Sequence, residues 1–368
     1  AHGSRRSRGR SGIGSITVGN DQAASRGAVE ASAPTRVDLA GGTLELWPPH
    51  LVQPGALTVN VAIDRRVWAR VEPIADGVVI ESKDTPSRSE ASDVTTLIRS
   101  PGAPLAAYVL AALGIERGVK VATRLRLSAD SGLGPSSALA LAVAAAAGAA
   151  LSRTPAGEAL VPLVRDAEVQ ASGVPTGLEA HMAALHGGPL AVHFEPGSVR
   201  VERLAADPGR IEESLLLVDS GKTRVPVPDT SDAAPGPIES RAGVREALET
   251  IGEGAASVRK ALTEARFADV GELFAREWEA RKCLGAEVTT PEIDRIVSLA
   301  RAEGGAAKAC GAGGGGIVAV WASPGARGKG CRERVEGALK EAGFRFLPFR
   351  LDLRGLEVSA PASPQKPL

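Results

Sequence analysis

Two glycines and two serines stand directly before a long apolar run in the middle of the chain. The segment "SADSGLGPSSALALAVAAAAGAAL", residues 128–151, places Gly132, Gly134, Ser136 and Ser137 ahead of a stretch of alanine, leucine and valine. The first amides of a helix have no intrahelical partner, and the helix dipole adds about half a positive charge there. Glycines let the main chain approach a polyphosphate, and serine hydroxyls can bind phosphate oxygen or Mg²⁺. The loop is therefore a candidate phosphate site, although a tight turn into a core helix would use the same residues.

The elements around this loop follow from the spacing of apolar and turn-forming residues. Short β-branched runs separated by Gly, Pro and Asp predict strands, and apolar residues three and four apart predict helices. Strands are predicted at 35–42, 56–73, 77–84, 122–130, 188–197, 214–221, 316–323 and 345–355, and helices at 155–173, within 239–284, at 290–304 and at 331–343. Thr290 can cap the third of these helices, with Pro291 in its first turn. The mixture predicts an α+β fold with a lobe boundary near 187–200.

Length and charge limit the function classes. With 368 residues, the chain exceeds the usual compact domain, which predicts one bilobal domain or two packed ones. Lys plus Arg and Asp plus Glu both number 43, so the net charge of zero argues against a general nucleic-acid or membrane partner. Cys283, Cys310 and Cys331 fit neither a disulfide framework nor a zinc spacing, and we expect a cytoplasmic protein. Residues 1–28 are predicted to be a disordered leader or tag, and residues 359–368 a disordered tail.

Two other segments contain parts of known nucleotide-binding motifs. "SGKT", residues 220–223, ends like a Walker A loop but lacks the glycine that should precede it. "GAGGGG", residues 311–316, lies too late in the chain for a dinucleotide-binding fingerprint. Neither a classical P-loop nor a Rossmann site is predicted.

Three segments in order carry a more specific signal. "APTRVDLAGGTLELW", "SGLGPSSAL" and "KACGAGGGGIVAV" resemble the three signatures of the GHMP kinase superfamily, which includes galactokinase, homoserine kinase, mevalonate kinase and phosphomevalonate kinase. The resemblance spans about residues 33–355. Connecting text such as "GVPTGLEAHMAALHGG" is similar to the bacterial sugar-kinase branch that contains heptose-7-phosphate kinase.

The resemblance implies a fold and an activity. It implies a two-lobed α+β structure with an N-terminal lobe at 29–190, of the ribosomal-protein-S5-domain-2-like type, and a ferredoxin-like C-terminal lobe at 191–358. The implied reaction is ATP- and Mg²⁺-dependent transfer of a phosphoryl group to a hydroxyl of a small sugar or sugar phosphate. The expected partners are a nucleotide and a sugar, in a monomer or homodimer.

The same resemblance assigns the nucleotide end of the site. Its ATP-binding positions are Gly132, Leu133, Gly134, Pro135, Ser136, Ser137 and Ala138, and its magnesium ligands are Ser136 and Glu168. Oxygen ligands suit this hard cation. Pro135 stands where relatives often carry serine and removes one amide from the loop. Without the family, Glu168 would read as a solvated charge on a helix.

The acceptor end is assigned likewise. Arg36 matches an arginine near the acceptor, and Glu45, with Thr43 beside it, falls where galactokinase has a sugar-binding aspartate. One carboxylate can accept hydrogen bonds from two vicinal hydroxyls. The remaining substrate positions are Gly311, Gly313, Gly314 and Gly315. The alternatives are a surface ion-pair arginine, a loop glutamate and a flexible connector. Trp47 could stack on a sugar ring or belong to the core.

One position breaks the family pattern. Relatives in this branch carry a Gln-Asp pair after the "PTG" turn, and the aspartate orients or deprotonates the attacking hydroxyl, whereas this chain has Glu179 and Ala180. Ala180 occupies the place of the aspartate, and Glu179 points about 100° away on a helix. His181 is a further candidate base or a packing residue.

Loss of the base leaves several functions open. A general base typically supplies about 10² to 10⁴ in rate, so alignment and Mg²⁺ could still support a slow kinase. The alternatives are a mevalonate-type or amino-alcohol kinase, and a catalytically disabled ATP- or sugar-binding protein on the same fold. Glu45 and Trp47 favour a sugar as the acceptor.

Overall fold

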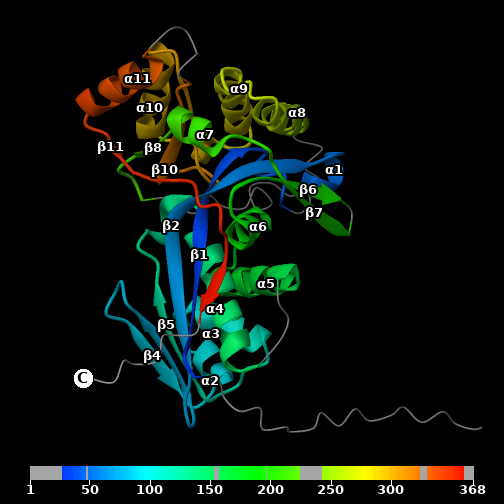
Figure 1. The fold of residues 1–368 in the computed structure, drawn as a ribbon, viewed down its shortest axis with the longest axis vertical. Coiled ribbons are helices and arrows are strands. Elements are labelled where there is room, and N and C mark those ends of the chain that lie inside the picture. Colours follow the sequence, from blue (N-terminus) through cyan, green and yellow to red (C-terminus); the bar gives the residue numbers. More distant parts are fainter. Residues whose placement is uncertain are drawn as a thin grey trace, which may run out of the picture.

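The computed structural model describes residues 27–46, 49–152, 157–195, 197–223, 243–323 and 330–359. Residues 1–26 of the expected leader, residues 360–368 of the expected tail, and Trp47 lie outside the described residues. In the description below, helices and strands carry the labels of Figure 1.

A large mixed sheet forms the lower and central part of the molecule in Figure 1. Its strand order is β12-β1-β2-β5-β3-β4, and β6 and β7 extend it from β2. The strands are β1 (Val29–Ala40), β2 (Leu57–Pro73), β3 (Val78–Ser82), β4 (Arg88–Ala91), β5 (Val119–Arg124), β6 (Pro189–Glu195), β7 (Ser198–Arg203) and β12 (Glu357–Ser359). Strand β2 is long enough to pair with β6 near its start and with β5 near its end. All pairs are antiparallel except β3 with β5.

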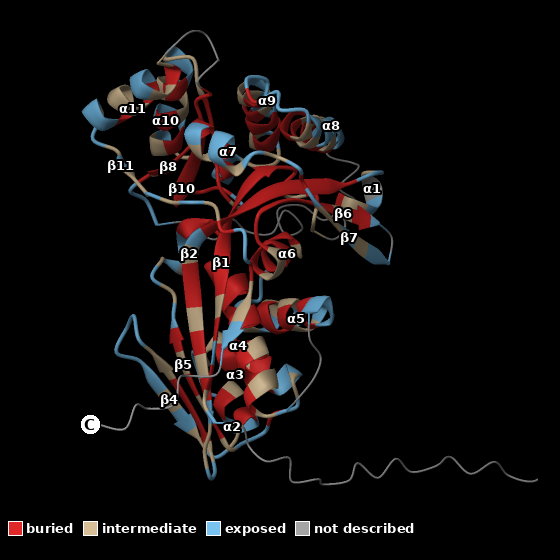
Figure 2. Cartoon of the chain, in the orientation of Figure 1, coloured by how far each residue is buried: buried red, intermediate tan, exposed pale blue. Residues whose placement is uncertain are grey.

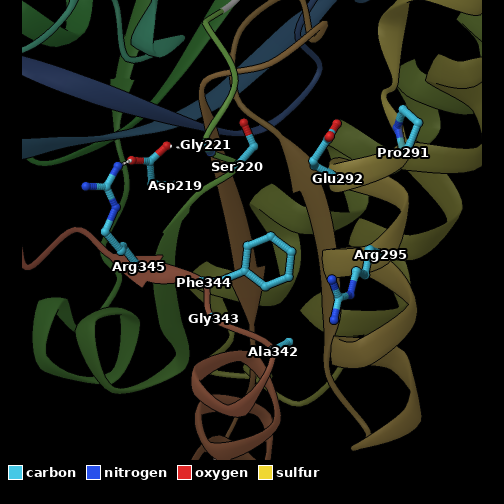
Figure 3. A pocket seen from close by; sticks show the side chains of 10 residues that line it. All are labelled: Asp219, Ser220, Gly221, Pro291, Glu292, Arg295, Ala342, Gly343, Phe344 and Arg345. Atoms are coloured by element: carbon cyan, nitrogen blue, oxygen red, sulfur yellow. Dashed lines mark hydrogen bonds and ion pairs between the residues drawn. The ribbon is translucent and has the colours of Figure 1, made fainter.

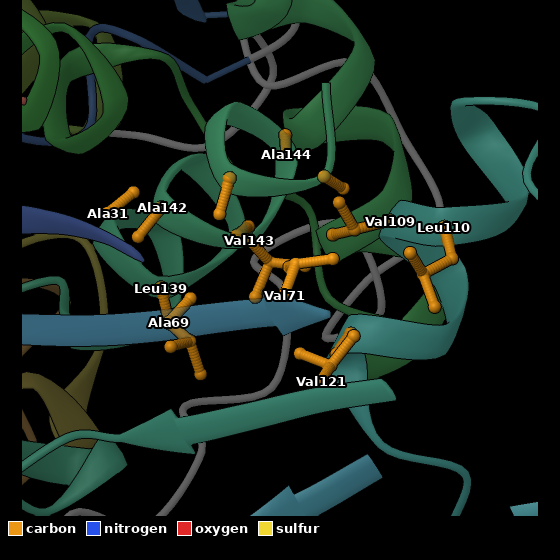
Figure 4. Close-up of a cluster of buried hydrophobic side chains, with 14 of the residues drawn as sticks. Ala31, Ala69, Val71, Val109, Leu110, Val121, Leu139, Ala142, Val143 and Ala144 are labelled. Carbon is orange, nitrogen blue, oxygen red and sulfur yellow. The ribbon is translucent and has the colours of Figure 1, made fainter. Parts of the chain in front are cut away.

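The helices of this lobe pack on the sheet or on one another. They are α1 (Pro49–Val52), α2 (Val94–Ile98), α3 (Leu105–Ala112), α4 (Pro135–Ala150), α5 (Leu160–Ser172) and α6 (Glu179–His186). The alanine-rich helix α4 is the predicted buried helix, and it packs on β1 and β2. Its small side chains let it lie close to the sheet, where Val71, Val109 and Leu139 fill the same core (Figure 4). Among the described residues, no helix combines the length and apolarity needed to cross a membrane.

A second, four-stranded antiparallel sheet forms the other lobe. It contains β8 (Leu215–Asp219), β9 (Ala306–Ala309), β10 (Ile317–Trp321) and β11 (Arg345–Phe346), in the order β11-β8-β10-β9. The helices of this lobe are α7 (Pro208–Ser214), α8 (Val244–Thr263), α9 (Val270–Lys282), α10 (Pro291–Ala302) and α11 (Cys331–Glu341). Short 3₁₀ turns at Ala129–Ser131, Gly157–Ala159 and Ala286–Val288 complete the described elements. Helices after β8 and after β10 give the ferredoxin-like topology that the sequence led us to expect.

The strand predicted at 345–355 is much shorter than expected, because only Arg345–Phe346 pairs with β8. Pro348 has no amide hydrogen to donate to a ladder, so the chain leaves the sheet there. It then crosses to the large sheet, where Leu351 bridges Ile63 and β12 pairs with β1. The large sheet therefore contains strands from both sides of the expected division at 190/191.

The two sheets meet in a buried zone at the upper end of β1 and β2, which is continuously red in Figure 2. Leu39 and Val59 from the large sheet share one apolar cluster with Leu217, Phe274 and Trp321 from the other lobe. A contiguous core across the junction holds the two lobes in a fixed relation. Loops from both lobes are therefore positioned against one another at this level.

Candidate functional site

A cavity of about 510 Å³ lies at the junction of the lobes. It is lined by residues within the segments 36–46, 103–105, 130–137 and 168–180, together with residues 281, 311 and 312. Several sequence-predicted residues line it: Arg36, Thr43, Glu45, Gly132, Gly134, Ser136, Ser137, Glu168, Glu179, Ala180 and Gly311. The structure thus brings together residues from all three signature segments.

The central glycine loop adopts a backbone that only glycine tolerates easily. Gly132 and Gly134 have φ of 79° and 70°, and Gly134 caps the start of α4. A Cβ on Gly132 would lie 2.5 Å from the Cys310 carbonyl oxygen, and one on Gly134 would lie 2.9 Å from the Ala180 Cβ. Pro135 occupies the first helical turn, where its missing amide costs no intrahelical bond. The start of α4 therefore lies at the cavity, and glycine at 132 and 134 lets the loop pack closely on Cys310 and Ala180.

Other predicted members of the loop have different surroundings. Leu133 and Ala138 are fully buried and belong to the apolar cores beneath the loop. Neither residue lines the cavity, and the Ala138 N–H donates to the Gly134 carbonyl oxygen within the helix. Ser136 and Ser137 both line the cavity, and the Ser137 hydroxyl donates a 2.8 Å hydrogen bond to Glu168.

Glu168 is a buried carboxylate on α5, not a solvated helix charge. Its Oε2 lies 3.0 Å from Nε2 of the fully buried His181. Burial alone would raise the pKa of Glu168, but hydrogen bonds from His181, Ser136 and Ser137 outweigh it and lower the pKa. An ionised carboxylate therefore stands beside the glycine loop. His181 contacts this carboxylate and is not among the residues that line the cavity.

Arg36 ties the first signature segment to the loop and to α6. Its backbone N–H donates to the Leu133 carbonyl oxygen at 2.9 Å, and its Nη1 donates to the Gly132 carbonyl oxygen at 2.6 Å. Its Nη2 forms a 2.6 Å ion pair with Glu179 Oε1. Since Arg36 is only 7% exposed, it is not a surface ion-pair arginine.

Glu179 and Ala180 both line the cavity, although they are successive residues at the start of α6. The Glu179 side chain turns toward Arg36 and is 2% exposed. Burial raises its pKa, while the Arg36 charge opposes that rise. The angular separation on the helix therefore does not take Glu179 out of the cavity.

Glu45 is held in a tight turn. Thr43 has a φ of 93°, and its N–H donates a 3.0 Å hydrogen bond to Glu45 Oε2. A Cβ on Gly177 would lie 1.8 Å from the Glu45 Cγ, so glycine at 177 makes room for this side chain. Burial, with the nearby negative charges of Glu179 and Asp38, raises the pKa of Glu45 to about 8.

The third signature forms a fixed loop that packs on the first two. A Cβ on Gly311 would lie 3.0 Å from the Gly132 carbonyl oxygen, and Gly311 and Ala312 line the cavity. The next glycines turn toward Val288: a Cβ on Gly313 would lie 2.2 Å from its carbonyl oxygen, and the Gly314 N–H donates to that oxygen at 2.9 Å. Gly315 has a φ of 137°, a conformation reserved for glycine. Of these glycines, Gly311 is the one that lies at the cavity.

Four buried charged residues at this site were not predicted: Asp38 and Arg281 line the cavity, and Glu277 and Lys308 lie behind them. Asp38 Oδ2 lies 3.2 Å from Arg281 Nη1 and 3.3 Å from Lys308 Nζ, and Lys308 also pairs with Glu277 at 2.8 Å. Arg281 donates in addition to the Gly311 carbonyl oxygen. Asp38 could have been found from the strand pattern, since positions two apart, such as Arg36 and Asp38, share a face. Lys308 begins the third signature segment but was not assigned a role, and Glu277 and Arg281 of α9 have no local sequence signal.

A second cavity of about 380 Å³ lies in the smaller lobe (Figure 3). Asp219 and Arg345 form a 2.9 Å ion pair at its edge, and the Arg295 guanidinium lies 5.7 Å from the Phe344 ring centre. Ser220 of the "SGKT" segment lines this cavity, which shares no lining residue with the first one. That segment is therefore not part of the glycine-loop site.

Across the part of the chain that the structure describes, no cluster of three or more His, Cys, Asp or Glu side chains could hold a metal ion. A comparison with curated protein sequences found no match.

Solved structures of small-molecule kinases have the same fold. A D-glycero-D-manno-heptose 1-phosphate kinase from Bacteriodes thetaiotaomicron is 21% identical with a TM-score of 0.71, over 91% of this chain and 100% of that one. Lactococcus lactis galactokinase complexed with galactose is 16% identical with a TM-score of 0.71, over 91% and 95%. Methanococcus jannaschii mevalonate kinase is 19% identical with a TM-score of 0.65, over 88% and 98%. The expected two-lobed α+β fold is thereby confirmed.

Family models agree with this fold in both lobes. Residues 102–188 match the GHMP kinases N terminal domain, and residues 258–341 match GHMP kinases C terminal. The first match contains the glycine loop and Glu179, and the second contains Arg281 and Gly311. With both domains matched in the expected order, the chain belongs to the GHMP kinase family.

Proposed function

We propose that this protein transfers the terminal phosphoryl group of ATP, with Mg²⁺, to a hydroxyl group of a small sugar or sugar phosphate. The observation that carries the proposal is the convergence of the glycine loop, the Arg36–Glu179 pair and Gly311 on one cavity. The names of the heptose 1-phosphate kinase and the galactokinase support a sugar as the acceptor. The cytoplasm is the expected compartment, in line with the free thiols of Cys283, Cys310 and Cys331.

The nucleotide end of the cavity suits a triphosphate. The start of α4 lines the cavity through Gly134, Ser136 and Ser137, and free amides at a helix N-terminus can donate hydrogen bonds to phosphate oxygens. Ser136 and Glu168 would hold Mg²⁺, and the lowered pKa of Glu168 keeps this carboxylate ionised as a hard cation requires. The ion supplies charge neutralisation and alignment of the phosphates when bound.

Glu179 is the proposed proton acceptor for the attacking hydroxyl. It lines the cavity beside Ala180, and burial moves its pKa upward from the ordinary value, toward the range in which general bases work well. Arg36 orients the carboxylate through their ion pair. Ala180 supports a second candidate function, a nucleotide- or sugar-binding protein with impaired catalysis, because the residue in the aspartate's place cannot take a proton.

An ADP-release assay over monosaccharides, heptose phosphates and mevalonate tests the reaction. We expect turnover with a sugar in the parent protein and at least a tenfold lower kcat in Glu179→Gln, with little change in KM. Turnover that appears only in Ala180→Asp would support the impaired-binder alternative. Turnover with mevalonate and no sugar would contradict a sugar acceptor.

Calorimetry with a nonhydrolysable ATP analogue tests the nucleotide site separately. Glu168→Gln should weaken binding of the analogue in the presence of Mg²⁺ by tenfold or more. Glu253→Gln, which changes an exposed carboxylate on α8, is the matched control and should bind as the parent does. Equal binding by the two variants would argue against the proposed magnesium ligand.

A further inference from the structure

The acceptor end of the cavity is rich in carboxyl groups. Asp38, Glu45 and Glu179 all line it, alongside the guanidinium groups of Arg36 and Arg281. The two guanidinium groups face carboxylates in turn, Arg36 with Glu179 and Arg281 with Asp38. Among the described residues that line this end, each cation thus already has an anionic partner.

Each of the two guanidinium groups also donates to the backbone. Arg36 Nη1 donates to the Gly132 carbonyl oxygen, and Arg281 Nη2 donates to the Gly311 carbonyl oxygen. Lys308, which stands behind Asp38, is shared between Asp38 and Glu277. A phosphate or carboxylate that took a cation from one of these pairs would leave a buried carboxylate without its partner, which is costly.

The same wall has carboxylate oxygens without donors. No described residue donates to Asp38 Oδ1 or to Glu179 Oε2, and both atoms are buried. Thr43 supplies the hydrogen bond to Glu45 Oε2. Nε of Arg36 and of Arg281 also lacks an acceptor among the described residues. These buried atoms are closed off from the cavity, so a ligand meets this wall at Glu45, which is partly exposed. A hydroxyl group can both donate to that carboxyl group and accept from it, whereas a phosphate dianion only accepts.

The raised pKa of Glu45 also favours an uncharged ligand. Burial and the charges of Glu179 and Asp38 raise its pKa to about 8. An environment that opposes the charge of its own carboxyl group opposes further negative charge from a ligand.

Resting on the kinase function proposed above, we infer that the phosphoryl acceptor is an uncharged polyol, carrying neither phosphate nor carboxylate, whose hydroxyls bind Glu45 beside the Asp38 and Glu179 carboxyl groups. The bound nucleotide and Mg²⁺ occupy the other end of the cavity, by the glycine loop. Asp38 and Arg281 are therefore specificity-determining residues through the charge balance that they set.

Matched pairs of ligands test this inference. Mannose and mannose 6-phosphate, galactose and galactose 6-phosphate, and ribose and ribose 5-phosphate are titrated by calorimetry into protein with Mg²⁺ and a nonhydrolysable ATP analogue. We expect the uncharged member of at least one pair to bind, and to bind at least tenfold more tightly than its phosphate. Tighter binding of a phosphorylated member, or binding of no member of any pair, would overturn the inference.

Variants that change the charge at position 45 test the inference further. Glu45→Lys should increase affinity for the sugar phosphate relative to the free sugar by tenfold or more, while Glu45→Gln should weaken binding of the free sugar and reduce the discrimination. Glu253→Lys, on the exposed face of α8, is the control and should leave the ratio unchanged. An unchanged ratio in Glu45→Lys, with the variant folded by circular dichroism, would also overturn the inference.

The two proposals fail differently. If the ATP analogue does not bind but a free sugar binds better than its phosphate, the kinase function fails and the inference on the ligand's charge stands. If the analogue binds and the phosphorylated sugars are preferred, the kinase function stands and the inference fails.

Discussion

Glu45 lies in the cavity with its carboxyl group close to two others, those of Glu179 and Asp38. Because its pKa is raised from 4.5 to about 8, the folded protein holds this proton over a pH range in which the unfolded chain has lost it. Glu45 therefore contributes stability that is fully present below pH 4.5 and is lost as the pH rises toward about 8.

Glu45→Gln removes this titration and is expected to flatten the pH dependence. The melting temperature of the variant, relative to the parent without ligand, should rise steadily between pH 5 and pH 8. Thermal unfolding followed by circular dichroism at several pH values measures this difference. A difference that stays constant with pH would show that Glu45 does not titrate in this range.

At the scale of single residues, the sequence could place those that carry a local pattern. The glycine loop, Glu168 and Arg36 were named from motifs, and all of them meet at the cavity. Arg281 could not be named, because its role arises from contacts with Asp38 and Gly311, distant in the chain. Long-range ion pairs leave no periodic trace in a sequence.

The turn before α6 packs on the Glu45 side chain, and the contact is closest at Gly177. A Cβ there would lie 1.8 Å from the Glu45 Cγ, so Gly177→Ala must displace that side chain or the turn. We expect a loss of about 1–3 kcal/mol in unfolding free energy, typical of overpacking, and weaker sugar binding.

Gly337→Ala is the matched control for that change. Gly337 lies inside α11, and a Cβ added there would have nothing within 4 Å, so alanine should stabilise the helix by up to about 1 kcal/mol. Urea denaturation of both variants compares them directly. Equal stability of the two variants would contradict the close contact at Gly177.

At the scale of elements, a capping residue correctly predicts where a helix starts, whereas alternating apolar residues interrupted by a proline predict a strand that is too long. Thr290 caps α10 as predicted, with its hydroxyl accepting from the Ile293 N–H. The strand expected at 345–355 was wrong beyond Phe346, since alternating apolar residues continue past Pro348 without a ladder to join. Where a segment pairs depends on its neighbours in space, and its own pattern does not encode them.

The buried charges join the lobes of the whole molecule. Asp38 comes from β1 of the large sheet, whereas Glu277 and Lys308 come from α9 and β9 of the other lobe, and all three are fully buried. Lys308→Met would leave two buried carboxylates without their shared cation, and a loss of about 3–5 kcal/mol in unfolding free energy is expected.

Lys340→Met provides the comparison, because Lys340 forms an exposed pair with Glu336 on α11. Its loss should cost about 0.5 kcal/mol or less. Urea denaturation measures both losses in unfolding free energy when the dependence of this free energy on urea concentration has the same slope in the parent and the variants. A cost below about 1 kcal/mol for Lys308→Met would mean that the cluster tolerates the loss of its cation.

The two-lobed arrangement itself followed from the resemblance of three short segments to one family. The pairing of the C-terminal strand β12 with the large sheet did not follow from that resemblance. This strand is only three residues long, Glu357–Ser359, and has no distinctive pattern. Its place is set by the space left beside β1.

That returning strand puts the two ends of the described chain next to each other, with Glu30 opposite Ser359. A circularly permuted chain is therefore geometrically accessible: a short linker could join the neighbourhood of Ser359 to Val29, and new ends could open at the exposed turn around Gly102. Such a rearranged polypeptide should keep the same tertiary structure while both of its termini lie at the turn around Gly102.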